Sequence, residues 1–346
     1  MRHRRPTFRL NLQRHSRLVT LALVVGVSVG LSGAQEARGQ AYPPPPGKIF
    51  QGVAGTPIAS YQRAVGKHPA VFQIFSAWGE WVPGMFADAA AARARLMLHI
   101  TTASGTREMI TPQGIADGEG DAWLIELNNA IAGSGHPVYV RLMAEMDNAN
   151  NPYAAYSATG VFRGRAHSTR AFVLAWKRAT LILRGGSLTH IDAVLHGLGL
   201  PRLHAHSDLP VGQVSMLWVP QVAGLPDVSG NQPRDYWPGR AWVDWVGTDF
   251  YAKFPNWSGL SGFYRAFGGA PFVFGEYALW GSDDPEWVTR LFAWVRSHTR
   301  ARMLVYNLGV DPNGPFRLSL YPESARALRT ALAGSRYPAF APDWQP

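Results

Sequence analysis

Two glutamates stand at the ends of two short apolar runs that share one pattern. Glu145 ends the run that begins at Pro137, and Glu276 ends the run that begins at Pro271. Apolar runs of this length, bounded by Gly or Pro, are typical of strands that are buried on both faces of a parallel sheet. The alternative for one strand-end glutamate is a structural ion pair, and Arg141 is a candidate partner for Glu145.

A pair of carboxyl groups on two similar strands favours one chemistry in particular. One carboxyl can protonate the oxygen of a leaving group while the other attacks the anomeric carbon of a sugar. A retaining glycosidase needs the two groups about 5–5.5 Å apart, a separation that strands on opposite sides of a small barrel can supply. The two glutamates therefore predict a hydrolase that acts on glycosidic bonds.

The strands that would carry these glutamates belong to a set of eight apolar runs. The runs are Ile49–Val53, Val71–Trp78, Leu96–Ile100, Val138–Met143, Val214–Val219, Trp242–Phe250, Phe272–Phe274 and Met303–Tyr306. Helix signals lie between several of them: Ser168 is expected to cap a helix over Thr169–Arg184, and Ser282 or Asp283 to cap a later one. Eight buried strands that alternate with helices predict an α/β fold, a single (β/α)₈ TIM barrel.

The carboxyl ends of the predicted strands are rich in aromatic and polar side chains. In such a barrel the active site lies at these ends. Aromatic faces stack on sugar rings and amides bond hydroxyl groups, so the set predicts a groove for a neutral polar polymer. The candidates for substrate binding are Trp78, His99, Arg141, Asn148, Trp218, Tyr251, Trp257 and Trp280.

Structural alternatives exist for several of these positions. His99 could be a wall or core histidine, Trp257 could serve packing alone, and Asp249 could cap a turn. No second histidine stands at ligand spacing from His99, and the chain has no cysteine, so we expect no metal and no cofactor. The absence of cysteine also excludes thiol catalysis and disulfides.

The first 34 residues have the pattern of a secretory signal peptide. Six arginines lie within the first seventeen residues, and an uncharged apolar run of fourteen residues, Leu18–Leu31, follows them. That run is shorter than the roughly 20 residues that span a bilayer. We therefore expect a secreted protein, or an anchored one if the segment is retained, with no stable membrane insertion of the mature chain. Residues 35–47, which include four consecutive prolines, are expected to form a stiff linker before a domain over residues 48–338.

The net charge of +10 does not indicate a nucleic-acid partner. The six arginines of the signal pattern contribute +6 to this net charge, and their removal leaves a net charge of 10 − 6 = +4 for the mature chain. No run of Lys and Arg with interleaved aromatics is present, so we expect a poly- or oligosaccharide substrate, no nucleic acid, and a monomer.

Four segments of the chain resemble glycoside hydrolase family 26, the retaining β-mannanases of the large clan of (β/α)₈ glycosidases. VRLMAEMDN (140–148) is similar to the fourth strand of that family, and PFVFGEYAL (271–279) to its seventh. YWPGRAWVDWVGTDFY (236–251) resembles the segment that leads into the sixth strand, and MLWVPQ (216–221) resembles the fifth. The resemblance implies Glu145 as the general acid/base, Glu276 as the nucleophile and Tyr251 as a contact of the nucleophile.

One position departs from the family pattern. The family has His directly before its acid/base, where it contacts the sugar at the point of cleavage, and this chain has Ala144. The departure bears on specificity for mannan and not on the chemistry of two carboxyls; His99 could reach the same space from the neighbouring strand. It also leaves open a catalytically inactive carbohydrate-binding barrel, and the fold alone leaves open a polysaccharide lyase or a glycosyl-transferring enzyme.

Overall fold

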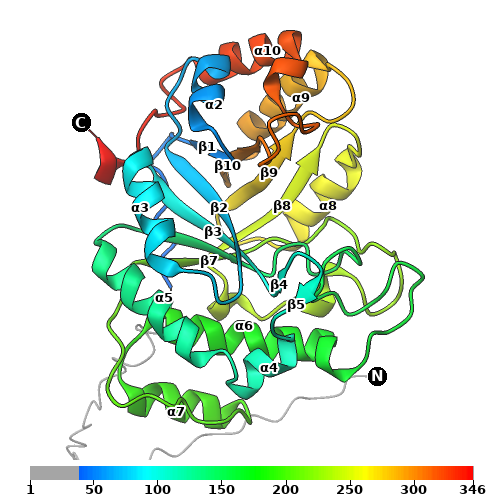
Figure 1. Ribbon diagram of the computed structural model, residues 1–346. Coiled ribbons are helices and arrows are strands. Elements are labelled where there is room, and N and C mark those ends of the chain that lie inside the picture. Colours follow the sequence, from blue (N-terminus) through cyan, green and yellow to red (C-terminus); the bar gives the residue numbers. More distant parts are fainter. Residues whose placement is uncertain (1–38, 346) are drawn as a thin grey trace, which may run out of the picture.

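A closed barrel of eight parallel strands forms the centre of the computed structural model, which describes residues 39–345 (Figure 1). Around the barrel the strand order is β1-β10-β9-β8-β7-β6-β3-β2. The strands are β1 (Phe50–Ala54), β2 (Val71–Ala77), β3 (Arg95–Thr101), β6 (Val138–Leu142), β7 (Val214–Trp218), β8 (Trp245–Tyr251), β9 (Phe272–Ala278) and β10 (Ala301–Asn307). Each of the eight predicted runs forms one of them, and the predicted single (β/α)₈ barrel is confirmed. The predicted signal peptide lies outside the described residues.

Helices pack around the outside of the barrel (Figure 1). They are α2 (Ile58–Val65), α3 (Val82–Ala92), α4 (Pro112–Asp117), α5 (Asp121–Ser134), α6 (Thr169–Arg184), α7 (Leu188–Gly197), α8 (Trp257–Ala266), α9 (Pro285–Ser297) and α10 (Pro322–Leu332). Short 3₁₀ turns cover Arg165–His167, Pro233–Tyr236, Arg240–Trp242, Leu318–Leu320 and Pro342–Trp344, and a small hairpin joins β4 (Ala103–Ser104) to β5 (Arg107–Glu108).

The observed capping residue is the predicted one at α6 and a different one at α9. The Ser168 hydroxyl accepts a hydrogen bond from the Ala171 N–H and caps α6, as predicted. At α9 the cap is Asp284, and neither Ser282 nor Asp283. The reason is that the Asp283 carboxylate turns to the neighbouring helix, where it accepts the first-turn N–H groups of α10.

The strands alternate their side chains between the barrel interior and the helices. At the amino-terminal end of the barrel, buried apolar groups such as Phe50, Met97 and Trp245 pack together. Closer to the carboxyl ends, buried polar side chains appear on the same strands, among them Gln73 and Arg141. Because the period of a strand is two residues, these polar groups share the interior with the apolar ones and form its upper layer.

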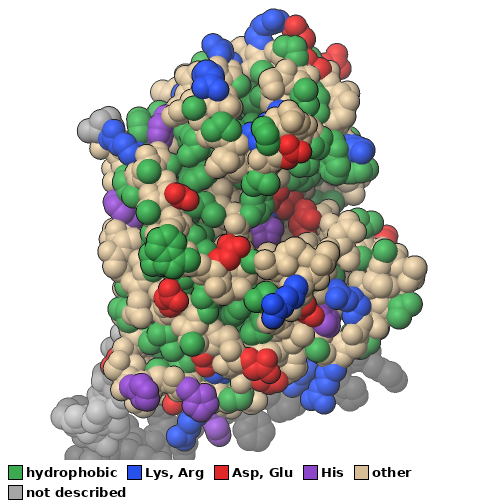
Figure 2. All heavy atoms as spheres, viewed as in Figure 1, with side chains coloured by type: hydrophobic (Ala, Val, Ile, Leu, Met, Phe, Trp, Pro, Cys, Tyr) green, Lys and Arg blue, Asp and Glu red, His purple; other side chains and the backbone are tan. Residues whose placement is uncertain are grey.

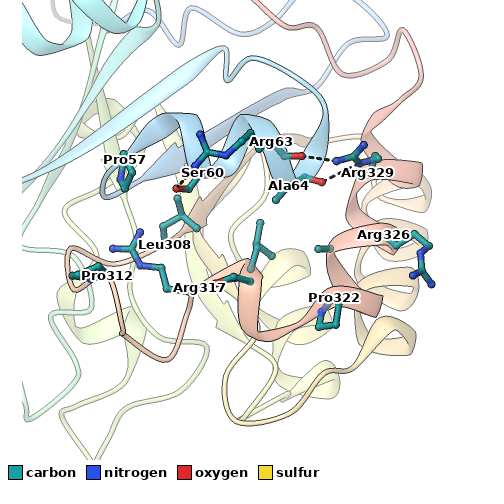
Figure 3. Close-up of a pocket in the computed structure, with 13 residues that line it drawn as sticks. Pro57, Ser60, Arg63, Ala64, Leu308, Pro312, Arg317, Pro322, Arg326 and Arg329 are labelled. Carbon is teal, nitrogen blue, oxygen red and sulfur yellow. Dashed lines mark hydrogen bonds between the residues drawn. The ribbon is translucent and has the colours of Figure 1, made fainter.

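Hydrogen bonds from side chains to backbone carbonyls join two neighbouring helices and hold the segment before β1 against the barrel. Arg329 on α10 donates to the carbonyls of Arg63 and Ala64 at the end of α2, and so ties these two helices together (Figure 3). Arg95 and Tyr139 both donate to the Tyr42 carbonyl, at 2.8 and 2.7 Å. Part of the proline-rich segment predicted as a linker therefore lies against the barrel.

A search of residues 39–345 for membrane spans finds no helix with the length and apolar character to cross a bilayer.

Candidate active site

A cavity of about 720 Å³ opens where the barrel strands end. Figure 2 shows a hollow near the middle of the visible face, with acidic and histidine side chains gathered in it. The lining residues include these sequence candidates: His99, Glu145, Asn148, Tyr251, Glu276 and Trp280. The structure thus brings both candidate glutamates and four of the candidate binding residues into one cavity.

A bulge in β9 turns Glu276 into the barrel. Thr248 of β8 pairs with Phe274, but Phe250, two residues later, pairs with Tyr277, three residues later, so β9 carries one extra residue. A bulge of this kind re-aims a side chain and is common beside active sites. Without it, strand alternation would send Glu276 to the helix side.

Both carboxylate oxygens of Glu276 accept hydrogen bonds. On Oε1, Arg141 Nη1 lies at 2.8 Å and Gln73 Nε2 at 3.3 Å. On Oε2, the Tyr251 hydroxyl lies at 2.5 Å and Asn307 Nδ2 at 2.8 Å. These contacts fix the orientation of the carboxylate and favour its charged form.

The pKa of Glu276 lies well below its usual range. Burial alone would raise it, but the Arg141 charge, the neighbouring His99 and the Tyr251 hydrogen bond together outweigh burial. His99 Nδ1 is 3.5 Å from Glu276 Oε1, and burial lowers the pKa of the imidazole, so His99 is neutral near pH 7. An ionised Glu276 has the charge state that a nucleophile needs.

Glu145 reaches the cavity through an unusual backbone. Met143 and Glu145 both have positive φ, 47° and 53°, which non-glycine residues seldom adopt and which is typical of functional sites. Asn148 Nδ2 donates to Glu145 Oε2 at 3.0 Å, and the Asn151 amide donates to the Glu145 carbonyl at 2.9 Å. The loop after β6 therefore holds both the backbone and the carboxyl of this residue.

The pKa of Glu145 is raised, opposite in direction to that of Glu276. Burial is the largest cause and the negative charge of Glu276 is the second, while Asn148 and Arg141 oppose them. Asp249 is a further carboxyl in the lining of the same cavity. Besides burial, the negative charge of Glu145 raises the pKa of Asp249, so the two carboxyls together favour a proton on one of them.

Arg141 is the buried cation beside these carboxyls. Its Nη2 lies 2.8 and 2.6 Å from the two oxygens of Asp249, while Nη1 donates a hydrogen bond to Glu276 Oε1. Burial and the two neighbouring glutamates raise the pKa of Asp249, against the attraction of Arg141. One guanidinium cannot neutralise three carboxylates, and the site is therefore expected to retain at least one proton.

Three of the predicted tryptophans do not line the cavity. Trp218 has no solvent exposure because its indole points outward from β7 and packs on Trp237 and Phe267. Trp78 is buried against Trp123. Trp257 opens α8, where it packs edge-on against Phe250 and beneath the Arg290 guanidinium. These placements leave Trp218 no exposed face on which a sugar could stack.

Other aromatic side chains line the cavity instead. Trp280, predicted from sequence, is joined there by Phe75, Phe254 and Phe316. Phe254 and Phe316 each pack edge-on against Trp280, and more than half of the Phe254 side chain is exposed. Aromatic surface of this kind suits the apolar faces of sugar rings.

Ala144 does not reach the cavity. Its methyl group is buried with Leu217 and Val219, and its carbonyl accepts a hydrogen bond from the Tyr153 hydroxyl at 2.6 Å. His99 is therefore the histidine that lies beside Glu276 in this structure. Within residues 39–345, no group of three or more His, Asp or Glu side chains is arranged to hold a metal ion.

Comparisons with known proteins point to one group of solved structures. No family model and no curated protein matches the sequence. An endo-β-1,4-mannanase double mutant from Cellulomonas fimi superposes with a TM-score of 0.54 at 16% identity, over 89% of this chain and 74% of that one. A family 26 β-mannanase from Bacteroides ovatus gives 0.53 at 14% identity, over 89% and 93%.

A mannanase from Bacillus subtilis is similar to the same degree, with a TM-score of 0.53 at 13% identity over 86% of this chain and 87% of that one. The chain has the fold of these mannanases. At such low identity the similarity establishes the fold alone, so the argument for chemistry depends on the side chains described above.

Proposed function

We propose that this protein is a secreted retaining glycoside hydrolase that cleaves β-linked polysaccharide, β-mannan or a related β-glycan. The observation that carries the proposal is that a partly buried glutamate, Glu145, and a buried one, Glu276, line one cavity at the carboxyl ends of the strands and have opposite pKa shifts. Opposite shifts of two carboxyls in one site assign an acid and a nucleophile. The fold that the chain shares with β-mannanases supports a glycoside hydrolase as the class of enzyme.

In the first step Glu276 attacks and Glu145 protonates. An ionised oxygen of Glu276 forms a bond to the anomeric carbon, and the bond from that carbon to the glycosidic oxygen breaks. The proton held by Glu145 passes to the departing oxygen, so the leaving sugar departs as a neutral alcohol. Arg141 and Tyr251 hold Glu276 ionised and oriented before the attack.

In the second step Glu145 changes from acid to base. Once Glu276 is esterified, its negative charge is gone and one of the causes that raise the Glu145 pKa is removed. Glu145, now a carboxylate, takes a proton from water, and the hydroxyl attacks the anomeric carbon. The ester bond to Glu276 breaks, and the sugar leaves with its original anomeric configuration.

The lining of the cavity favours a neutral glycan. Of the described residues that line it, none is Lys or Arg, and its apolar surface comes largely from Trp280, Phe254 and Phe316. Amide side chains, among them Asn148, Asn150 and Gln221, also line the cavity and suit sugar hydroxyls.

A substrate screen with a matched variant tests the proposal. Purified protein would be incubated with β-mannan, mixed-linkage β-glucan and β-xylan, and released reducing ends would be measured beside Glu276→Ala. We expect reducing ends from the wild type with at least one glycan and essentially none from the variant. Retention of glycan without new reducing ends would indicate a binding barrel, unsaturated ends a lyase, and longer oligomers a transferase.

Secretion is a separate part of the proposal, inferred from residues 1–34 of the sequence. Expression of the full chain in a secreting host, followed by mass spectrometry of the exported protein, would locate the mature amino terminus. We expect it close to residue 35. A full-length mass in the membrane fraction would indicate an anchored protein instead.

A further inference from the structure

Asn307 ends β10 and is almost fully buried, with 6% exposure, beside two residues that line the cavity. Its Nδ2 donates to two acceptors, Glu276 Oε2 at 2.8 Å and Tyr251 Oη at 2.9 Å. Its Oδ1 accepts the Gly309 N–H at 2.8 Å. All three contacts of this amide involve the candidate nucleophile, a neighbour of that nucleophile, or the loop that follows β10.

The Gly309 contact determines which atom of the amide is the nitrogen. A backbone N–H needs an acceptor, so Oδ1 faces Gly309 and the NH₂ group faces Glu276 and Tyr251. An amide NH₂ only donates. The Tyr251 oxygen must therefore accept from Asn307, and the proton of its own hydroxyl is directed to Glu276 Oε2 at 2.5 Å.

We propose that Asn307 is a positioning residue for the nucleophile, an inference that rests on the proposed glycosidase function. Asn307 donates one hydrogen bond to Glu276 Oε2 directly. By donating to Tyr251 Oη as well, it orients the Tyr251 hydroxyl so that this group donates a second hydrogen bond to the same oxygen. Two donors on one oxygen stabilise the carboxylate before it attacks and again when it departs from the glycosyl ester. Asn307 acts on the sugar through Glu276 and Tyr251.

The main structural alternative is that Asn307 only holds the loop after β10 through Gly309. The two roles differ in what they do to Glu276. A residue that merely holds the loop would leave the pKa of Glu276 unchanged, whereas loss of two directed hydrogen bonds would raise it. The acid limb of the pH dependence of kcat/KM reports that pKa in the free enzyme.

The test is a cycle of Asn307→Leu, Tyr251→Phe and the double variant. Leu has the same number and branching of side-chain heavy atoms as Asn, and it removes both donors. For Asn307→Leu we expect kcat/KM near neutral pH to fall about 10- to 100-fold, as for the loss of hydrogen bonds to a charged group. The acid limb should move to higher pH, and this movement should be larger in the wild-type background than in Tyr251→Phe, where no hydroxyl remains to be directed.

One control variant and one replacement variant accompany the cycle. Asn313→Ala alters an exposed asparagine of the same loop, and it should change neither the rate nor the acid limb. If Asn307→Leu fails to fold, Asn307→Ala replaces it with the same expectation. A uniform loss of kcat/KM at every pH, equal in both backgrounds, would overturn the proposal and establish a role in loop structure.

A second measurement is independent of glycan hydrolysis. A water-soluble carbodiimide labels protonated carboxyls, and peptide mass spectrometry can follow its reaction with Glu276 between about pH 4 and pH 6. We expect faster labelling of Glu276 in Asn307→Leu than in the wild type. If the labelling rates differ in this way but the wild type hydrolyses no glycan, the positioning role of Asn307 is supported and the proposed hydrolase function is rejected. If Glu276 is labelled equally fast in both proteins and the wild type hydrolyses glycan, only the positioning role of Asn307 is rejected.

Discussion

The Nη1 atom of Arg141 lies 2.8 Å from Glu276 Oε1, and the Arg141 side chain has no exposure to solvent. The other end of the same guanidinium is bonded to both oxygens of Asp249. A single buried cation therefore balances much of the charge of two acidic residues that come from neighbouring strands. Among the groups that favour the ionised state of Glu276, Arg141 therefore has the largest effect.

Replacement of Arg141 by Met should destabilise the fold and abolish catalysis. Removal of one partner from a buried ion pair leaves uncompensated charge, at a cost of about 3–5 kcal/mol. Urea unfolding at pH 7 would measure this loss. The matched control is Arg326→Met, because Arg326 pairs with Glu323 on the surface, where both side chains are more than half exposed. That change should alter the unfolding free energy by less than about 1 kcal/mol, and equal effects of the two variants would contradict the account.

Gly275 should not tolerate a side chain. A Cβ at this position would lie 2.8 Å from the Cζ of Arg141 and 2.9 Å from Asp249 Oδ1, both of them held in place by the ion pair. We expect Gly275→Ala to displace the guanidinium, to destabilise the protein by about 1–3 kcal/mol, and to lower kcat more than it raises KM. Kinetics and thermal unfolding would measure both effects.

Gly262 provides the comparison for Gly275. It lies within α8, and an added Cβ would meet nothing within 4 Å. Alanine there should stabilise the helix by up to about 1 kcal/mol and leave activity unchanged. If Gly275→Ala behaves like Gly262→Ala, the close packing of Arg141 against β9 is not required for function.

The two glutamates should have opposite effects on stability as pH changes. The pKa of Glu145 is raised in the folded protein. Its contribution to the free energy of unfolding is therefore fully present below the unfolded pKa of roughly 4.3, and it is lost as pH rises through the folded pKa. Glu145→Gln should therefore gain stability relative to the wild type as pH rises from about 4.3.

For Glu276 the folded pKa is depressed, and the sign reverses. Its contribution is present above roughly 4.3 and is lost as pH falls through the folded pKa. Glu276→Gln should be less stable than the wild type at pH 7, with a difference that shrinks in acid. Denaturant unfolding of both variants at several pH values would measure these trends, and a shift of the same sign for both would contradict the assignment of acid and nucleophile.

The barrel was predictable from sequence because each strand is a short, nearly continuous apolar run. The strand-end position of Glu145 and of Tyr251 followed from the same runs. What such runs cannot give is which residues face inward, because a strand that is buried on both faces shows no alternation. Trp218 is the example: it ends a strand as expected, yet its side chain points to α8 and away from the cavity.

Other parts of the site have a weak signal or none in the sequence. Gln73 is a single polar residue inside an apolar strand, and only the structure shows it beside Arg141, which donates to its Oε1 at 2.7 Å. Asn307 directly follows the predicted run Met303–Tyr306, and this position alone assigns it no role. The bulge that aims Glu276 inward depends on the pairing of β9 with its neighbours, which are distant in sequence. A polar residue that interrupts an apolar run was the one available signal for Gln73.

The central claim is that Glu276 forms a covalent bond to the sugar and that Glu145 supplies and removes the proton. Glu145→Ala, given an activated aryl β-glycoside that needs no leaving-group proton, should release the aryl group in a burst and then stall. Mass spectrometry of the intact protein and of its peptides should show one glycosyl unit attached at Glu276. Full turnover without an adduct, or an adduct at any other residue, would contradict the claim.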